Sequence, residues 1–268
     1  MTLEPDAAPP RPSTVDRIYV LDGGQAHVRD ISPWSPGVGV RESRVFSDNA
    51  YLIVHGGDLL VWDSGVDDAL IDSPGGEVVA HDVRGVKRRS LVSQFAELGV
   101  DPARVTDVAF SHAHFDHVGN SRLFSGAVWY VQRPEYEAMF GPDPGAYGFL
   151  PRLYETMLHN QTVLLDGDRD IFGDGSVTVL STPGHTPGHQ SLLVRLPRTG
   201  PVILSGDVAH FAENFEQRRV PTFNADHAAS LRSMERIDAL CRDEGAQLWI
   251  NHDLAQSDAL PHAPAPIE

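Results

Sequence analysis

The sequence predicts an α/β fold in which two β-sheets pack face to face with helices on the outside. Two observations support this prediction. Short runs of β-branched and aromatic residues, bounded by turn residues, occur in an early and a late part of the chain, and helical patterns accompany both. The chain has 268 residues, 41% of them hydrophobic, so one domain with a large core accounts for its length.

The early part contains three predicted strands followed by a helix. A turn at residues 55–58 separates the second strand from the third, and Gly99 and Pro102 end the helix. We expect strands at residues 17–21, 50–54 and 59–62 and a helix at residues 90–98.

The late part contains more strands and a long amphipathic helix at residues 225–242. Residues 141–160 are rich in proline, glycine and aromatic residues, which predicts a long loop that is either functional or a lid packed on the core. We expect the late strands at residues 105–110, 128–131, 161–165, 177–181, 191–196, 202–204 and 247–250.

The composition excludes several classes of protein. The net charge is −16, which disfavours nucleic acid and anionic membranes as partners. The single cysteine, Cys241, excludes an intramolecular disulfide framework. No apolar run resembles a membrane span or a secretory signal, so we expect a cytoplasmic protein. We expect one domain at residues 16–259 between flexible, proline-rich tails at residues 1–15 and 260–268.

Three histidines and an aspartate lie within six residues, directly after an apolar strand, in the pattern H-x-H-x-D-H: His112, His114, Asp116 and His117. His112 and His114 project on the same side of an extended backbone. Imidazole and carboxylate groups suit zinc, iron, manganese and cobalt. Burying four such groups together costs hydration free energy, and without a cation nothing would compensate for that loss. The motif therefore predicts a metal site.

Three further candidates each follow an apolar run. His185 follows the strand at 177–181, Asp207 follows the strand at 202–204, and His252 follows the strand at 247–250. Each is a weak signal alone, because a lone histidine at a strand end is more often structural. The shared layout of strand, short turn and ligand-type side chain indicates that the three converge on one site.

With these residues the chain resembles the metallo-β-lactamase superfamily, and within it the quorum-quenching N-acyl-homoserine lactonases. The similarity runs from about residue 50 to residue 253 and is strongest in residues 111–120 and in residues 181–192, S-T-P-G-H-T-P-G-H-Q-S-L. The resemblance implies an αββα sandwich of two packed mixed β-sheets flanked by helices, with a dinuclear metal site along one edge of the sheets.

The resemblance also implies a function: opening of the lactone ring of N-acyl-homoserine lactones. Two divalent cations, zinc first and cobalt, manganese or iron as alternatives, would lower the pKa of a bridging water, and the resulting hydroxide would attack the lactone carbonyl. Asp116 would also pass a proton to the leaving alkoxide. Similar proteins suggest a homodimer. By position, the first ion would take His112, His114 and His185, the second Asp116, His117 and His252, with Asp207 bridging both and Asp63 in support.

His210 departs from the family pattern. The best-known lactonases carry a tyrosine three residues after the bridging aspartate, where its hydroxyl touches the substrate carbonyl, and this chain has His210 there. Imidazole can donate the same hydrogen bond, so His210 is a catalytic candidate, and a packed histidine without a catalytic role remains the alternative. For an acyl chain we expect an apolar groove with these candidate linings: Trp34, Phe46, Phe149, Leu150 and Phe211.

Two other functions remain open. A hydrolase of the same fold acting on another small lactone, an ester or a phosphotriester needs the same seven ligands. A non-catalytic metal-binding protein is the alternative of a different class, although the presence of all seven expected ligands gives no sign of a decayed enzyme.

Overall fold

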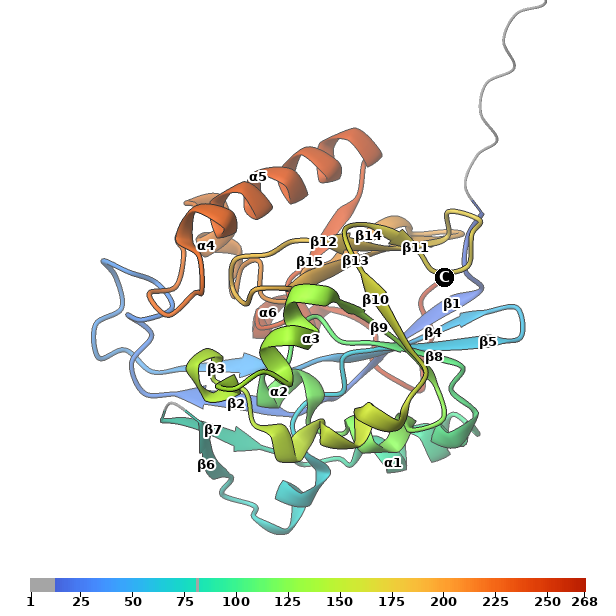
Figure 1. Cartoon of the computed structure of the whole chain (residues 1–268), viewed down its shortest axis with the longest axis horizontal. Helices are drawn as coiled ribbons and strands as arrows, with labels where there is room; N and C mark the ends of the chain where they lie inside the picture. Colours follow the sequence, from blue (N-terminus) through green and yellow to red (C-terminus); the bar gives the residue numbers. More distant parts are fainter. Residues whose placement is uncertain (1–12, 81) are drawn as a thin grey trace, which may run out of the picture.

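The computed structural model describes residues 13–80 and 82–268, and its two large sheets pack face to face (Figure 1). Both sheets are mixed, with parallel and antiparallel neighbours. The first sheet contains, in spatial order, β1 (Arg17–Leu21), β4 (Ala50–His55), β5 (Asp58–Trp62), β8 (Asp107–Ala109), β9 (Val128–Gln132) and β10 (Thr162–Leu165). The second contains β11 (Arg169–Asp170), β12 (Val177–Ser181), β13 (Gln190–Leu196), β14 (Gly200–Leu204) and β15 (Gln247–Trp249).

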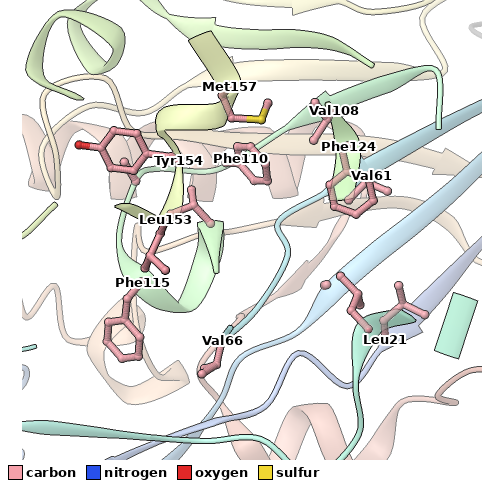
Figure 2. Packing of buried hydrophobic residues seen from close by; sticks show 14 of the residues in the cluster. Leu21, Val61, Val66, Val108, Phe110, Phe115, Phe124, Leu153, Tyr154 and Met157 are labelled. Carbon is pink, nitrogen blue, oxygen red and sulfur yellow. The ribbon is translucent and has the colours of Figure 1, made fainter. Parts of the chain in front are cut away.

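Alternation along β5 shows how the first sheet divides the core. Leu60 and Trp62 pack in the cluster between the two sheets. Val61 faces the other way and packs with Phe95 of α1 (Leu91–Glu97) and with Phe124, which lies close to Val61 in Figure 2. Because successive strand side chains point to opposite faces, an apolar strand with both faces buried belongs in the middle of a layered fold.

The longest helix, α5 (His227–Glu244), covers the outer face of the second sheet, where Met234 and Ile237 pack against Ile203 of β14 (Figure 1). Its N-cap, Asp226, accepts a hydrogen bond from the Ala229 amide, and Gly245 ends the helix in the left-handed conformation. The remaining α-helices are short: α2 (Phe115–Val118), α3 (Arg133–Met139), α4 (Ala212–Glu216) and α6 (Leu254–Ala259).

The αββα arrangement and the main predicted elements are confirmed. All ten predicted strands are present with shifts of a few residues at their ends, and the two predicted helices correspond to α1 and α5. The segment 141–160 forms three short 3₁₀ helices, η4 (Pro144–Tyr147), η5 (Pro151–Leu153) and η6 (Glu155–His159), and it packs on the core through the buried Phe149 and Tyr154.

A third sheet was not predicted. Its strands are four residues long and carry Gln25, His27, Arg84 and Gly85, so their hydrophobic pattern does not differ from that of a loop. The sheet lies beside the candidate site, and its inner face contributes Ala26 and Val28 to the cavity described below. Its strands, in spatial order, are β3 (Arg44–Ser47), β2 (Gln25–Val28), β7 (Val83–Val86) and β6 (Glu77–Ala80).

The carboxyl-terminal segment is not the flexible tail that we expected. Ile267 and Ile18 exchange two backbone hydrogen bonds of 2.9 Å, and the Ala263 amide donates to the Val20 carbonyl. Because β1 is an edge strand, its outer backbone groups need partners, and residues 260–268 supply them despite their prolines.

At the other end, residues 1–12 of the predicted amino-terminal tail lie outside the described residues. Val15 is buried and donates its amide to the Arg195 carbonyl. The assignment of a single domain to residues 16–259 stays a prediction. Among the described helices, none is both long and apolar enough to cross a membrane.

Candidate metal centre

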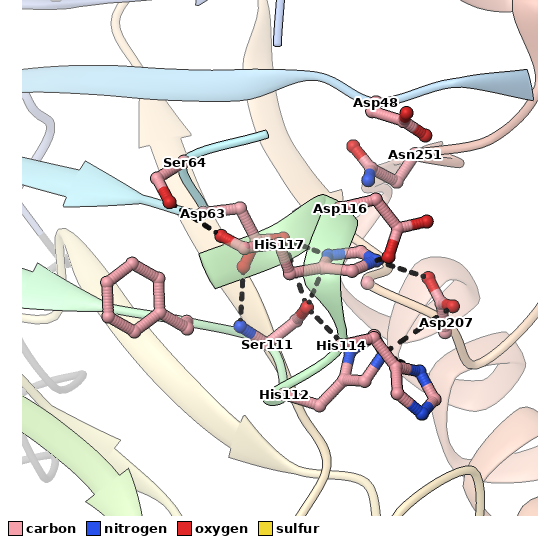
Figure 3. Close-up of polar contacts among 12 residues, drawn as sticks. Asp48, Asp63, Ser64, Ser111, His112, His114, Asp116, His117, Asp207 and Asn251 are labelled. Atoms are coloured by element: carbon pink, nitrogen blue, oxygen red, sulfur yellow. Dashed lines mark hydrogen bonds and ion pairs between the residues drawn. The ribbon is translucent and has the colours of Figure 1, made fainter. Parts of the chain in front are cut away.

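The seven candidate ligands meet at one edge of the two sheets, where four strands end. Figure 3 shows five of them: His112, His114, Asp116, His117 and Asp207. β8 leads into the loop that holds His112 and His114, and the first turn of α2 carries Asp116 and His117. The loops after β12, β14 and β15 supply the other three ligands, which are His185, Asp207 and His252.

The ligand atoms form two groups. In the first, the atoms of His112, His114, His185 and Asp207 lie within 4.8 Å of one another. His114 Nδ1 is 2.7 Å from His112 Nε2 and 3.1 Å from His185 Nε2. In the second, Asp116, His117 and His252 meet the same limit.

Asp207 lies between the two groups. Its Oδ2 is 3.2 Å from His185 Nε2, and its Oδ1 is 3.3 Å from His117 Nε2 and 3.0 Å from His252 Nε2. One carboxylate thus presents one oxygen to each group, as a carboxylate that bridges two cations does. The side chain is 3% exposed.

Each of the five imidazoles has a hydrogen-bond partner on the ring nitrogen that points away from the centre. These contacts fix the ring orientations, and in a neutral ring they leave the inward nitrogen as an acceptor. The outward partners are the Ser111 hydroxyl for His112, the Tyr147 carbonyl for His114, Asp63 for His117, Asn224 for His185, and the Ser47 carbonyl and Asp48 for His252.

This donor set fits divalent cations. The inward nitrogens of His114 and His185 face each other with no proton to share, and buried His117 Nε2 and Asp207 Oδ1 have no hydrogen-bond partner among the described residues. Bare lone pairs at 2.7–3.1 Å repel one another unless a cation lies between them. Histidine nitrogens and carboxylate oxygens are ligands that zinc takes at about 2.0–2.2 Å.

The electrostatics of the two groups differ. Burial and the nearby His117 and His185 hold the pKa values of His112 and His114 well below the usual range, so both rings are neutral. Burial also opposes charge on His117 and His252, but the carboxylates around them, Asp207 foremost, outweigh it and raise the pKa of both rings. The protein thus holds negative charge against the second group, which favours a cation there.

Asp63 supports the cluster, as the sequence pattern suggested. Its Oδ1 accepts the Ser111 amide at 2.7 Å, and its Oδ2 accepts His117 Nδ1 at 2.9 Å and the Ser111 hydroxyl at 3.0 Å (Figure 3). The residue has φ = 55°, a conformation that aspartate and asparagine tolerate better than most side chains. A strained residue with three hydrogen bonds therefore fixes the strand end beside the motif.

His210 is buried next to the metal ligands rather than packed away from them. Its Nε2 lies 3.1 Å from Asp207 Oδ2, and its ring stacks on His252 with centroids 5.2 Å apart. Burial lowers the pKa of His210 to about 4, so the ring is neutral near pH 7. Its Nδ1 has no hydrogen-bond partner among the described residues.

A cavity of about 830 Å³ opens above the ligands and is lined by His210 and by five of the seven ligands, which are His114, Asp116, His185, Asp207 and His252. Trp34 and Phe46 line it as predicted, whereas Phe149, Leu150 and Phe211 do not. Phe149 and Phe211 are buried in the core, with Phe149 behind the ring of His114. The sequence analysis missed these wall residues: Ala26, Val28, Val83, Tyr147 and Phe223.

Three buried polar residues that contact the ligand loops were also missed as functional. Asp48 follows β3 directly, the same layout of strand end and carboxylate that pointed to Asp207, but β3 itself was not predicted. His189 accepts the Asp207 amide on Nε2 at 2.8 Å and donates from Nδ1 to the Thr182 carbonyl at 3.0 Å. Glu135 reaches the loops from α3, and the sequence held no signal for that long-range contact.

Comparison with known families follows from this geometry. Residues 43–241 match the family model described as the metallo-beta-lactamase superfamily. The chain belongs to this superfamily. Membership and the two His/Asp groups together indicate divalent metal binding.

Within the metallo-beta-lactamase superfamily, solved lactonases share the whole fold. The chain matches the crystal structure of a quorum-quenching N-acyl homoserine lactone lactonase with a TM-score of 0.82 and 25% identity, covering 96% of this chain and 100% of that one. It matches equally well, with 26% identity and 95% and 100% coverage, an N-acyl homoserine lactone hydrolase with the product N-hexanoyl-L-homoserine bound at its catalytic metal centre.

A curated relative carries a similar name. N-acyl homoserine lactonase AttM of Azorhizobium caulinodans is 40% identical over 166 residues, 60% of this chain. The match spans 63% of that relative's length.

Proposed function

We propose that this protein opens the lactone ring of N-acyl homoserine lactones with the help of two divalent cations. One observation carries the proposal: seven ligand-type side chains form two groups, and five of them line a cavity whose other walls are mainly apolar. A polar, metal-binding floor suits the ester of a lactone ring, and apolar walls suit an acyl chain. The similar solved lactonases support the choice of substrate.

Two cations would be held by the groups described above, with Asp207 shared between them. When bound, they supply Lewis acidity that polarises an ester carbonyl and makes hydroxide available near neutral pH. We propose zinc as the native metal, because nitrogen and oxygen donors without thiolate suit it, and cobalt, manganese or iron would fit the same donors. The proposed ligands of the first cation are His112, His114 and His185. Those of the second are Asp116, His117 and His252.

Asp116 has a second proposed role. It lines the cavity, and its two oxygens lie 3.9 Å from His117 Nε2 and 3.9 Å from His252 Nε2, at the loose edge of the second group. Its carboxyl can therefore carry a proton to the alkoxide that leaves when the ring opens. Asp207 also lines the cavity, but imidazoles enclose it and it is only 3% exposed, so Asp116 is the proposed proton carrier.

His210 is the proposed contact for the substrate. Its Nε2–H donates to Asp207, so the neutral ring has a lone pair on Nδ1, which is buried and has no hydrogen-bond partner among the described residues. The residue lines the cavity, and the amide N–H of a bound N-acyl lactone would donate to that nitrogen. Loss of one such hydrogen bond lowers kcat/KM about tenfold. The variant His210→Phe keeps the ring packing and removes the bond, and His210→Tyr supplies a hydroxyl oxygen that can accept in place of Nδ1.

The test is hydrolysis of N-butanoyl and N-decanoyl homoserine lactone followed by pH-stat, with an aryl phosphotriester as comparison substrate. Asp207→Asn, which removes the shared charge, is the inactive control, and His210→Phe and His210→Tyr report on the substrate contact. We expect fast lactone opening by the wild type, none by Asp207→Asn and little phosphotriester turnover.

Other outcomes discriminate the alternatives. Preference for the phosphotriester or for a lactone without an acyl chain would assign the site to another hydrolase of the same fold. Full metal loading without turnover of any ester would identify a non-catalytic metal-binding protein. The homodimer suggested by similar proteins stays a prediction, which sedimentation of the purified protein tests.

A further inference from the structure

Glu135 is a buried acid that the proposed reaction does not use. It lies in the first turn of α3, is 2% exposed, and forms no ion pair with any residue that the structure describes. Burial raises the pKa of its carboxyl to about 7. A buried acid without an ion-pair partner is costly unless its oxygens are hydrogen-bonded, so its partners reveal its role.

Both partners are backbone amides of metal-binding loops. Glu135 Oε1 accepts the Ala113 amide at 3.0 Å, and Oε2 accepts the Gly188 amide at 2.9 Å. Ala113 stands between His112 and His114, and Gly188 stands between His185 and His189. One carboxylate therefore connects the loop after β8 to the loop after β12, which belong to different sheets.

The contact is built closely. A Cβ on Gly188 would lie 2.3 Å from the Glu135 amide nitrogen and 2.6 Å from its Cβ, so only glycine lets the start of α3 approach the second loop this far. The distances that depend on this approach are those of the first ligand group, where His114 Nδ1 lies 2.7 Å from His112 Nε2 and 3.1 Å from His185 Nε2.

We infer that Glu135 is a positioning residue for the first metal: its carboxylate fixes the separation of the two loops and thereby the spacing of His112, His114 and His185. The inference rests on the proposed metal centre. It does not make Glu135 a ligand or a catalytic residue, because its oxygens accept backbone amides and the residue does not line the cavity.

The isosteric variant Glu135→Gln tests the inference. An amide has one acceptor oxygen, so its NH₂ group would face one of the two backbone N–H groups, and one loop would lose its anchor. Two controls match it. Glu137→Gln makes the same change at an exposed position of α3. Asn160→Ala removes a buried side chain that donates to the Phe124 and Ala127 carbonyls, outside the ligand loops.

Zinc affinity of the loaded proteins is measured at pH 8 by competition with a chromophoric chelator, and the cobalt-substituted proteins are compared by their visible d–d absorption. We expect Glu135→Gln to bind one of two ions about 10–100-fold more weakly and to change the cobalt spectrum. Glu137→Gln and Asn160→Ala should match the wild type in both, even if Asn160→Ala unfolds at lower urea.

Wild-type affinity and spectrum in Glu135→Gln would overturn the inference, as would equal weakening in Asn160→Ala. If Glu135→Gln does not fold, Glu135→Asp replaces it: the side chain is one methylene shorter, cannot reach both amides, and should show the same weakening. Lactone turnover is measured separately. A wild type that binds two ions but opens no lactone would refute the proposed substrate and leave the role of Glu135 standing, whereas a wild type that binds no ion would refute both.

Discussion

Asp63 and Ser111 show how single residues fix the geometry of the centre. Asp63 makes three hydrogen bonds, two to Ser111 and one to His117 Nδ1, and the last of these leaves His117 Nε2 pointing at Asp207. Ser111 in turn contacts both His112 and His117. The ligands therefore depend on residues that touch no metal themselves.

Asp63→Asn should weaken metal binding about 10–100-fold without unfolding the protein. Asparagine tolerates the φ of 55° at this position, so the change isolates the lost carboxylate oxygen. Calorimetric titration of zinc into the metal-free variant measures the effect. An affinity equal to that of the wild type would show that the Asp63–His117 contact has no influence on the metals.

Gly206 is required by both conformation and space. It has φ = 54°, and a Cβ would lie 2.6 Å from Ser111 Cβ and 2.7 Å from His189 Nε2. Gly206→Ala should therefore lower the free energy of unfolding by about 1–3 kcal/mol more than Gly99→Ala, which has a similar φ of 67° but open space. Urea denaturation compares the two variants. Equal losses in the free energy of unfolding would mean that the added methyl group does not crowd Ser111 and His189.

Glu135 should titrate near neutral pH. Burial raises its pKa from 4.5 to about 7, so the folded protein holds a proton that the unfolded chain releases between these values. The contribution of this group to stability is thus present below pH 4.5 and is lost as the pH rises to 7, by about 3 kcal/mol in total. A ¹³C NMR titration of the glutamate carboxyls should show one resonance, absent in Glu135→Gln, with a midpoint near 7; a midpoint near 4.5 would refute this.

At the scale of the elements, the site is made by loops at strand ends, and the small sheet forms a wall over it. The two faces of β2 differ: Val28 faces the cavity, whereas His27 faces away from it beside Arg84 of β7. Substitutions on the two faces of this sheet should therefore have different effects on the reaction.

Val28→Phe should narrow the acyl part of the cavity, and Val78→Phe on the outer face of β6 should not. Val28 is 5% exposed in the cavity wall, whereas Val78 is 55% exposed. We expect Val28→Phe to raise KM for N-decanoyl homoserine lactone about tenfold and to change KM for the N-butanoyl lactone little. If both variants treated the two lactones alike, the acyl chain would not run past β2.

Elements with strong apolar periodicity were predictable, and those defined by tertiary contacts were not. Strands such as β5 and β12 carry buried apolar residues on both faces, so the sequence alone indicates them. β2 and β7 are strands because they pair with each other, and their apolar side chains line the cavity beside them. Neither contact can be predicted from the local sequence. The same holds in the site: the local H-x-H-x-D-H motif was visible, whereas Asp48 and Glu135 reach the ligands from distant segments.

For the whole molecule, the net charge of −16 fits a small-molecule enzyme better than a protein that binds nucleic acid. The two sheets bring ligands from the loops after four strands to one edge, and several of these ligands line the cavity. At this edge we propose that two bound cations open a lactone ring.

The most direct test is to remove the metals with a chelator and to measure opening of N-hexanoyl homoserine lactone as zinc is added back. We expect no turnover by the metal-free protein and full recovery at two zinc ions per chain. Turnover that persists after complete removal of the metals, or its absence from a protein that holds two ions per chain, would contradict metal-dependent lactone opening at this site.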